Sequence, residues 1–291
     1  MQLKITGLSK TYPNGVHALK NINLTINNGL FGLLGPNGAG KSSLMRTIAT
    51  LQEADSGSIF LDDLNVLEKK DEVRGLLGYL PQEFGVYPNV SAEDLLHHLA
   101  VLKGATDKKS RNELVNALLH QTNLYDARKK KLGGYSGGMK QRFGIAQALI
   151  GNPKIIIVDE PTAGLDPTER NRFLNLLSEI SESVIVILST HIVEDVKELC
   201  SQMAIINKGE VLFEGHPMQA LDMVKGKIWK KFISKAEAKD LHESHKVIST
   251  KFNTGKIEMH VWSEEMLNSG FERSEAQLED VYFTVINGLM K

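Results

Sequence analysis

The sequence is poor in cysteine, in long apolar runs and in net charge. Cys200 is the one cysteine among 291 residues, so the chain cannot form an internal disulfide. Because no secretory signal pattern opens the sequence either, we expect a reducing, cytoplasmic compartment. No activating pattern surrounds Cys200, and we expect it to be a core residue. No apolar run approaches the roughly 18 to 20 residues that a membrane-spanning helix needs, so any membrane role should come through a partner.

Charge of either sign is not in excess. The chain carries 34 Lys and Arg against 35 Asp and Glu, a formal net charge of −1. No global basic bias therefore draws it to nucleic acid or to an anionic membrane. The densest basic run, Arg128–Lys131, is expected to be a solvated surface loop. The 42% hydrophobic content is sufficient for one large domain, or for a large domain and a small one.

One stretch fits the phosphate-binding template G-x-x-x-x-G-K-[ST] at every fixed position. It consists of Gly35, Pro36, Asn37, Gly38, Ala39, Gly40, Lys41 and Ser42. The apolar run before it, Leu30–Leu34, predicts a buried strand, and Ser43–Ala49 after it predicts a helix. Glycines let successive backbone N–H groups turn toward phosphate oxygens at the helix N-terminus. We expect Lys41 to reach the β- and γ-phosphates of a nucleotide and Ser42 to offer its hydroxyl to Mg²⁺.

A pair of carboxylates follows the β-branched run Ile155–Val158, which is typical of a parallel strand buried on both faces. Asp159 and Glu160 thus stand at the strand end where α/β folds bind ligands. One carboxylate can hold the Mg²⁺ shell, and the other can orient or deprotonate an attacking water. Acidic residues here can also be plain turn formers, but the phosphate loop upstream favours the functional interpretation. His191 comes just past another predicted strand, Val184–Leu188, at the same edge, although a lone histidine is more often structural.

Alternating apolar and polar residues over Leu3–Tyr12 and Ile22–Ile26 predict an antiparallel β-layer. Tyr12 stands beside a turn, where its ring can stack on a base or simply pack, and the local sequence favours neither. Gln82 follows a predicted strand over Leu76–Leu80. By itself Gln82 is an ordinary polar residue at a strand end, and its meaning depends on the motifs that follow.

The pattern after residue 83 is helical. A capping-box-like start over Ser91–Asp94 predicts a helix, in which Ser91 caps and Asp94 reaches back. The expected apolar face of this helix consists of Leu95, Leu96, Leu99 and Leu102. A second amphipathic helix is expected from about Arg111 to His120. Ser136-Gly137-Gly138 then opens a third, with Ser136 as its N-cap, and this is a second possible phosphate-binding helix end.

The residues after about 221 predict a small α/β appendage. Two alternating stretches, Lys246–Phe252 and Lys256–Trp262, flank Asn253-Thr254-Gly255 and indicate a β-hairpin. Ser274–Gln277 has the form of a capping box and is expected to open a last helix. The apolar face expected for that helix consists of Leu278, Val281, Tyr282 and Val285.

In chain order these motifs resemble those of the ATP-binding cassette (ABC) ATPases over residues 1 to about 220, and the set is far more specific than any single member. The matching positions are Tyr12 for the adenine-stacking aromatic, Gly35 to Ser42 for the Walker A loop, Gln82 for the Q-loop, Tyr135 to Met139 for the signature, Ile155 to Asp159 with Glu160 for Walker B and its catalytic glutamate, Ala163 to Asp166 for the D-loop, and His191 for the switch histidine. The signature departs from the commoner L-S-G-G-Q form at Tyr135 and Met139, but its Ser-Gly-Gly core is intact.

The resemblance implies an α/β fold with a P-loop NTPase core, an antiparallel β subdomain and a helical signature subdomain over about residues 83–150. Residues 1–220 would form the ABC ATPase domain, and residues 221–291 a C-terminal accessory domain. The resemblance also implies a head-to-tail dimer, in which ATP lies between the Walker A loop of one subunit and the signature helix of the other. This arrangement explains why Ser136 and Gly138 should face phosphate across an interface.

The resemblance further implies a set of ligands for ATP and Mg²⁺. Nucleotide contacts are expected from Tyr12, Gly35, Pro36, Asn37, Gly38, Ala39, Gly40, Lys41, Ser42, Ser43, Ser136, Gly137, Gly138 and Asp166. Metal contacts are expected from Ser42, Gln82 and Asp159. Catalytic roles are expected for Glu160, His191, Lys41 and Gln82. Because Glu160 and His191 are both present, the site should be competent for hydrolysis.

The resemblance favours the ATPase subunit of a membrane transporter, located peripherally at the cytoplasmic face of the cell membrane. Its expected partners are a membrane permease, which is a separate chain, and a second cassette, which is expected to be an identical copy. A tail that ends like Leu278–Tyr282 is similar to those of stand-alone cassettes that serve exporters, which favours export by analogy. A soluble cassette ATPase acting on nucleic acid or ribosomes is the alternative. The coiled-coil inserts, zinc sites or second cassette of that class are not visible, and no nucleic acid partner is expected. A small-molecule kinase would leave Ser136–Gly138 and His191 without a purpose.

Overall fold

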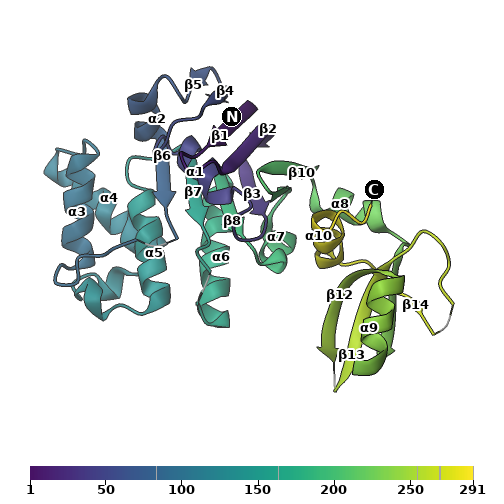
Figure 1. Ribbon diagram of the computed structural model, residues 1–291. Helices are drawn as coiled ribbons and strands as arrows, with labels where there is room; N and C mark the ends of the chain where they lie inside the picture. The colour runs from purple at the N-terminus through teal and green to yellow at the C-terminus, as the bar shows by residue number, and fades with distance from the viewer. Residues whose placement is uncertain (83, 163, 254, 269, 291) are drawn as a thin grey trace.

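A predominantly parallel sheet lies at the centre of the computed structural model, which describes residues 1–82, 84–162, 164–253, 255–268 and 270–290 (Figure 1). Its strand order is β10-β9-β3-β8-β7-β6, and β10 runs antiparallel to β9. The strands are β3 (Gly29–Leu34), β6 (Leu77–Leu80), β7 (Ile155–Asp159), β8 (Ile185–Thr190), β9 (Gln202–Asn207) and β10 (Glu210–Gly215). β7 and β8 are buried along their whole length, as their β-branched sequences predict for parallel strands covered on both faces.

Two layers cover the central sheet. On one face, α1 (Lys41–Ile48) and a second, antiparallel sheet pack against alternate side chains that include Phe31 and Ile157. On the other face, α6 (Pro167–Ser181) and α7 (Val193–Leu199) pack against the intervening side chains. The antiparallel sheet has the order β2-β1-β4-β5 and confirms the predicted antiparallel β-layer. Its strands are β1 (Gln2–Thr11), β2 (His17–Asn27), β4 (Ser56–Leu61) and β5 (Leu64–Asn65), and α2 (Lys70–Leu76) follows it.

The strand order decides which loops meet. β3, β8 and β7 are neighbours and run parallel, so their carboxyl ends lie at one edge of the sheet. Asp159 at the end of β7 pairs in register with Ser189 near the end of β8. The loop that follows β3 therefore lies at the same edge as Glu160 and His191, which is where a doubly wound sheet binds its ligands.

A helical subdomain lies beside the central sheet and has a hydrophobic core of its own. It contains α3 (Ala92–Leu102), α4 (Lys108–Gln121) and α5 (Gly137–Ala148), with short 3₁₀ turns at Tyr125–Ala127 and Leu132–Gly134. The predicted cap of α3 is present, because Ser91 Oγ accepts a hydrogen bond from the Asp94 N–H at 3.1 Å. The prediction for Leu102 is wrong, since this side chain is 70% exposed. The buried stripe follows Ala92, Leu96 and Ala100, and Leu102 lies on its flank at the last turn. Glu83, where this region was expected to begin, lies outside the described residues.

The C-terminal part of the chain forms a third sheet, with the order β12-β13-β11-β14. Its elements are α8 (Pro217–Val224), β11 (Ile228–Ile233), α9 (Lys235–Ser244), β12 (Lys246–Asn253), β13 (Lys256–Trp262), β14 (Glu272–Arg273) and α10 (Leu278–Ile286). The two strands of the predicted hairpin are present, and Thr254 of its turn lies outside the described residues. The predicted cap of the last helix is wrong. Gln277 caps α10, with its N–H bonded to Asp280 at 2.9 Å, while the Ser274 N–H pairs with the Ile228 carbonyl of β11.

The last helix joins the appendage to the ATPase-like part of the chain. Leu278, Val281 and Tyr282 of α10 pack in one cluster with Val196 of α7 and Val224 of α8. Figure 1 shows α10 between these helices and the third sheet, with α9 on the outer side of that sheet. The two parts of the chain thus share one core across the boundary expected at residues 220–221. Among helices in the described ranges, none has the length and apolar content that crossing a membrane requires.

Candidate nucleotide-binding site

The loop between β3 and α1 adopts a conformation that only glycine tolerates at two of its positions. Gly40, the N-cap of α1, has φ of 110°, and a Cβ there would lie 2.5 Å from the Ala18 carbonyl oxygen. A Cβ on Gly35 would lie 2.4 Å from the Ile206 carbonyl oxygen. The loop therefore turns tightly onto the N-terminus of α1, where free N–H groups and the helix dipole favour an anion.

A cavity of about 660 Å³ opens over this loop. It is lined by Tyr12, Val16, His17, Ala18, Lys20, Pro36, Asn37, Gly38, Ala39, Gly40, Lys41, Ser42, Ser43, Gln82, Glu160 and Lys208. The structure thus brings into one cavity most of the residues that the sequence predicted for a nucleotide. Sequence reasoning missed Lys20 and Lys208, which stand 188 positions apart and meet because the Lys20 N–H bonds the Gly209 carbonyl at 2.8 Å. Lysines are too common in sequences for these two to be predicted as part of the cavity.

Tyr12 lines the cavity and is anchored at its far end. Its hydroxyl donates to Gln52 Oε1 at 2.9 Å and lies 3.0 Å from Ser43 Oγ, which is on the first turn of α1. Tyr12 is thus partly buried and also lines the cavity. The anchored hydroxyl fixes the ring at the mouth of the cavity, where a flat base can stack on it.

Lys41 and Glu160 form an ion pair inside the site. Lys41 Nζ lies 3.4 Å from Glu160 Oε1, and the two side chains are 5% and 10% exposed. Lys41 also donates to the carbonyl oxygens of Gly35, at 2.6 Å, and of Pro36, at 3.2 Å. A buried charge is stable only when it is paired and hydrogen-bonded, and this set of partners holds Lys41 beside the glycine loop.

Glu160 is held in an unusual backbone conformation next to His191. Its φ is 47°, in the left-handed region that a non-glycine residue rarely adopts. The Glu160 N–H donates to the Ser189 carbonyl of β8 at 3.0 Å. Its second carboxylate oxygen, Oε2, accepts from His191 Nδ1 at 2.8 Å, which places the proton of the imidazole on that nitrogen. His191 is half exposed, so one face of this pair is open to solvent.

The oxygen atoms at this edge fit Mg²⁺. Asp159 is 3% exposed, and within the described ranges its Oδ1 has no hydrogen-bond partner. Ser42 presents its hydroxyl in the cavity on the first turn of α1, and Gln82 lines the same cavity. Carboxylate, hydroxyl and amide oxygens suit this hard cation, which takes one or two carboxylates and completes its shell with water and phosphate oxygens. In the part of the chain that is described, no cluster of three or more His, Cys, Asp or Glu could form an all-protein metal site.

The signature residues and Asp166 do not line the cavity of their own chain. Ser136 caps α5, and its Oγ accepts from the Met139 N–H at 3.2 Å. Asp166 caps α6 by accepting from the Glu169 N–H at 2.9 Å. An ion pair between Arg142 of α5 and Glu169 of α6 joins the two helices near these caps. Ala163, the first residue of the expected D-loop, lies outside the described residues.

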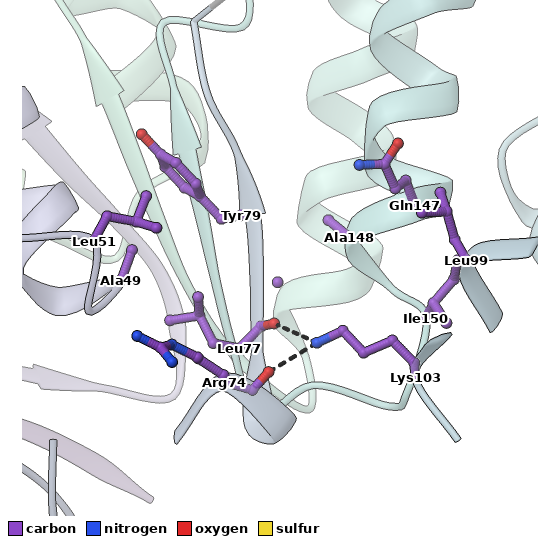
Figure 2. A pocket seen from close by; sticks show the side chains of 11 residues that line it. Ala49, Leu51, Arg74, Leu77, Tyr79, Leu99, Lys103, Gln147, Ala148 and Ile150 are labelled. Atoms are coloured by element: carbon purple, nitrogen blue, oxygen red, sulfur yellow. Dashed lines mark hydrogen bonds between the residues drawn. The ribbon is translucent and has the colours of Figure 1, made fainter. Parts of the chain in front are cut away.

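A second cavity, of about 280 Å³, separates the helical subdomain from the central sheet (Figure 2). Tyr79 of β6 and Leu51 after α1 line one side, and Leu99 of α3 and Gln147 of α5 line the other. Lys103 spans the cavity and donates to the Arg74 carbonyl at 2.8 Å. Burial lowers the pKa of this lysine, and burial together with the nearby Asp159 carboxylate raises the pKa of Tyr79. β6 lines this cavity and ends two residues before Gln82, which lines the nucleotide cavity, so the chain connects the two cavities directly.

Comparison with known proteins agrees with these motifs. The ABC transporter family matches residues 19–163. The ABC transporter ATP-binding protein YxlF of Bacillus subtilis is 33% identical over 98% of this chain and 99% of its own length. The methionine import ATP-binding protein MetN of Helicobacter hepaticus is 35% identical over 85% of this chain and 75% of its own length. The dimeric, post-hydrolysis structure of the ATP-binding cassette MJ0796 bound to ADP and Pi superposes with a TM-score of 0.66 at 28% identity, covering 74% of this chain and 98% of that one.

Proposed function

Because the chain belongs to the ABC transporter family as an ATP-binding subunit, we propose that it hydrolyses ATP in a head-to-tail dimer and so drives export through a separately encoded membrane permease. The observation that carries the proposal is the nucleotide cavity, which is lined by the glycine loop, Lys41 and Glu160, with Asp159 at the same sheet edge. A phosphate-binding loop without Glu160 and His191 would only bind a nucleotide. With them, the site has a base beside the place where the terminal phosphate lies.

Each residue has a role that follows from its position. The backbone N–H groups of the glycine loop and Lys41 bind the β- and γ-phosphates. Mg²⁺ would be held by Ser42, Asp159 and Gln82 and would supply charge neutralisation of the phosphates. Glu160 accepts the proton of the attacking water, and His191 fixes the orientation of its carboxylate through the 2.8 Å hydrogen bond to Oε2.

A second copy completes the site. Ser136 and Gly137 are exposed at the N-terminus of α5 and lie apart from the cavity of their own chain. α5 is 12 residues long, and its N-terminus presents N–H groups and the positive end of the helix dipole. These suit the γ-phosphate of a nucleotide bound to the other copy. MJ0796, a similar cassette, is dimeric in its complex with ADP and Pi, which supports this arrangement.

The dimer is tested with Glu160→Gln. This change keeps the shape and removes the base, so ATP should bind and persist, and the variant should form a stable dimer in the presence of ATP and Mg²⁺. Light scattering after gel filtration measures the mass. The matched control is the same variant without nucleotide, which should remain monomeric. If the variant stays monomeric with ATP and Mg²⁺, this result would count against the head-to-tail dimer.

The permease would dock at the cavity shown in Figure 2. Its lining includes Leu51, which is 62% exposed, and the chain that follows Gln82 carries Tyr87, which is 67% exposed. A segment that fills this cavity contacts β6 and therefore senses the position of Gln82. Export rests on the analogy of the C-terminal tail, since relatives of this chain include an importer.

Affinity purification from gently solubilised membranes tests the transport role. The expected result is a multi-spanning protein in stoichiometric amount, lost when Leu51 is replaced by Glu. The control Met266→Glu changes an apolar residue of the appendage that is 78% exposed and lines neither cavity, and it should retain the partner. Recovery with ribosomes or nucleic acid instead would favour a soluble, non-transport ATPase.

A further inference from the structure

A buried carboxylate outside the nucleotide cavity connects the elements that carry Glu160 and His191. Asp195, on the first turn of α7, is 0% exposed. Its Oδ2 accepts from Thr162 Oγ1 at 3.0 Å and from Thr190 Oγ1 at 3.4 Å. Its Oδ1 accepts from Arg170 Nε at 2.8 Å and from a second guanidinium nitrogen of Arg170 at 2.5 Å. These contacts could not be predicted from the sequence, because an acidic residue in the first turn of a helix is ordinary.

The partners of Asp195 come from three different segments. Thr162 is two residues after Glu160, and Thr190 is the residue immediately before His191. Arg170 lies on α6, one turn after the cap at Asp166. Thr162 and Thr190 are 4% and 1% exposed, so these contacts are made in a water-excluded environment. One carboxylate therefore joins the loop that carries Glu160, the strand end that carries His191, and the helix that follows Asp166.

The contacts act on the geometry of the catalytic pair. The Thr190 hydroxyl also accepts from the Ile192 N–H at 2.9 Å, so the backbone on both sides of His191 is tied to this one side chain. Glu160, at φ of 47°, depends on its surroundings to keep a strained conformation. A residue held in this way relaxes when a neighbouring anchor is removed. A relaxation of 1 Å is enough to break the hydrogen bond between Glu160 and His191, which is 2.8 Å long.

We propose that Asp195 is a positioning residue for ATP hydrolysis, which holds Glu160 and His191 at hydrogen-bonding distance through Thr162 and Thr190. The inference rests on the proposed function, because it assumes that Glu160 is the base. Asp195 touches neither the cavity nor the expected nucleotide. Its removal therefore acts on turnover and leaves nucleotide affinity in place.

The test compares Asp195→Asn with Glu194→Gln in the full-length protein. Glu194 is the adjacent residue on α7, pairs with Lys197 at 3.2 Å and is about half exposed, so its replacement is a matched control. Asp195→Asn should lower kcat by about tenfold or more, as losing a partner that orients a reacting group does, with the KM for ATP within about twofold of wild type. Glu194→Gln should leave both unchanged. Equal kcat values for the two variants would overturn the proposal.

Coupling to His191 separates positioning from general destabilisation. In a His191→Ala background, Asp195→Asn should lower kcat by only about threefold or less, because part of what it positions is already gone. A purely structural role predicts the same factor in both backgrounds, and that outcome would also overturn the proposal. Thr162→Val removes one hydrogen bond and leaves the Arg170 pair intact, so it should fold. The kcat of Thr162→Val should be lower than that of wild type, whereas Thr162→Ser, which keeps the hydroxyl, should have the wild-type kcat.

A readout without turnover keeps the two proposals apart. Nitrogen NMR of histidine-labelled protein reports the hydrogen bond at His191 Nδ1, with the signal assigned by its loss in His191→Ala. The signal should shift in Asp195→Asn and not in Glu194→Gln. If the wild-type protein hydrolyses no ATP but this shift occurs, the proposed function fails and the positioning contact stands. If the wild type hydrolyses ATP and neither the shift nor the kcat loss occurs, the role of Asp195 alone is refuted.

Discussion

Lys41 and Glu160 show how single residues prepare the site. The ammonium and the carboxylate neutralise each other at 3.4 Å, in a place that is nearly closed to solvent. Three further hydrogen bonds keep both groups beside the glycine loop: Lys41 donates to the carbonyl oxygens of Gly35 and Pro36, and Glu160 accepts from His191 Nδ1. A nucleotide phosphate can exchange for the carbonyl partners of Lys41 without leaving the charge unpaired at any stage.

Replacing Lys41 should therefore abolish tight nucleotide binding. Lys41→Ala is expected to weaken ATP binding by about thirtyfold or more, since removing one partner of a buried charge contact costs about 2 kcal/mol or more. Titration with a fluorescent ATP analogue measures the affinity. Lys4→Ala, which removes an exposed lysine from β1, serves as the control. Equal affinities of the two variants would contradict the assignment of Lys41.

Single residues also mark the limit of sequence reasoning. The glycine loop, Asp159 and Glu160 were predicted from local spacing, because the phosphate loop and the strand ends are properties of short segments, whereas the role of His191 was predicted from the family resemblance. The left-handed backbone of Glu160 and the contacts of Asp195 do not, because they depend on segments that are separated in the sequence by up to 33 residues.

At the scale of helices and strands, the contact between α5 and α6 holds the signature residues in position. Arg142 and Glu169 form a part-buried ion pair, and Arg172 holds the other oxygen of Glu169 at 2.9 Å. Gly138 lies directly against this carboxylate, and a Cβ at that position would be 2.1 Å from Glu169 Oε2. A side chain at this position would therefore have to displace the Glu169 carboxylate from its ion pair with Arg142.

Gly138→Ala should break this contact. The methyl group displaces Glu169 from Arg142 and tilts α5 against α6, so ATP-dependent dimerisation in the Glu160→Gln background should be lost, while the affinity of the monomer for ATP stays within about twofold. Analytical ultracentrifugation with ATP measures the dimer. Gly75→Ala is the matched control, because nothing lies within 4 Å of its Cβ position. If Glu169→Ala, which makes room for the methyl group, does not restore any dimer, the steric explanation is wrong.

Elements whose signal is local were predicted well, and those set by distant contacts were not. β7 and β8 are buried on both faces, as their apolar and largely β-branched sequences predict. The exposure of Leu102 depends on where the partner helices end. The start of α10 at Gln277 depends on the pairing of Ser274 with β11, which holds the preceding residues in an extended conformation.

At the scale of the whole molecule, His260 fastens the third sheet to α10. The buried imidazole of β13 bonds Asp280 of α10 at 2.7 Å and Glu258 at 3.0 Å. The hydrogen bond to Asp280, followed by that to Glu258, raises the pKa of His260 against the opposing effect of burial. Because α10 packs on α7 and α8, these bonds connect the appendage to the core of the ATPase-like part.

The stability of this joint should fall at high pH. A histidine whose pKa is raised in the folded state contributes stability that is fully present below its unfolded pKa of about 6.5, and that is lost as pH rises through the raised value. His260→Gln should remove this pH dependence and destabilise the protein by roughly 3 to 5 kcal/mol, because it breaks a buried pair. Urea unfolding followed by tryptophan fluorescence suits the test, since both tryptophans, Trp229 and Trp262, lie in the appendage.

The control for this prediction is His242→Gln, on the exposed side of α9. It should leave the unfolding midpoint and its pH dependence unchanged. An unfolding curve of His260→Gln that keeps the wild-type loss of stability above neutral pH would show that another group is responsible.

The ion pair between α5 and α6 also has a consequence for how the protein responds to ATP concentration. In the proposed dimer, these two joined helices would carry the N-terminus of α5, which would face the nucleotide of the other copy, and the cap of α6 at Asp166. Binding of ATP at one site would therefore change the orientation of the helix that contacts ATP at the other site. ATP binding to the dimer should be cooperative, with a Hill coefficient above one. The rate of hydrolysis should then rise steeply over a narrow range of ATP concentration.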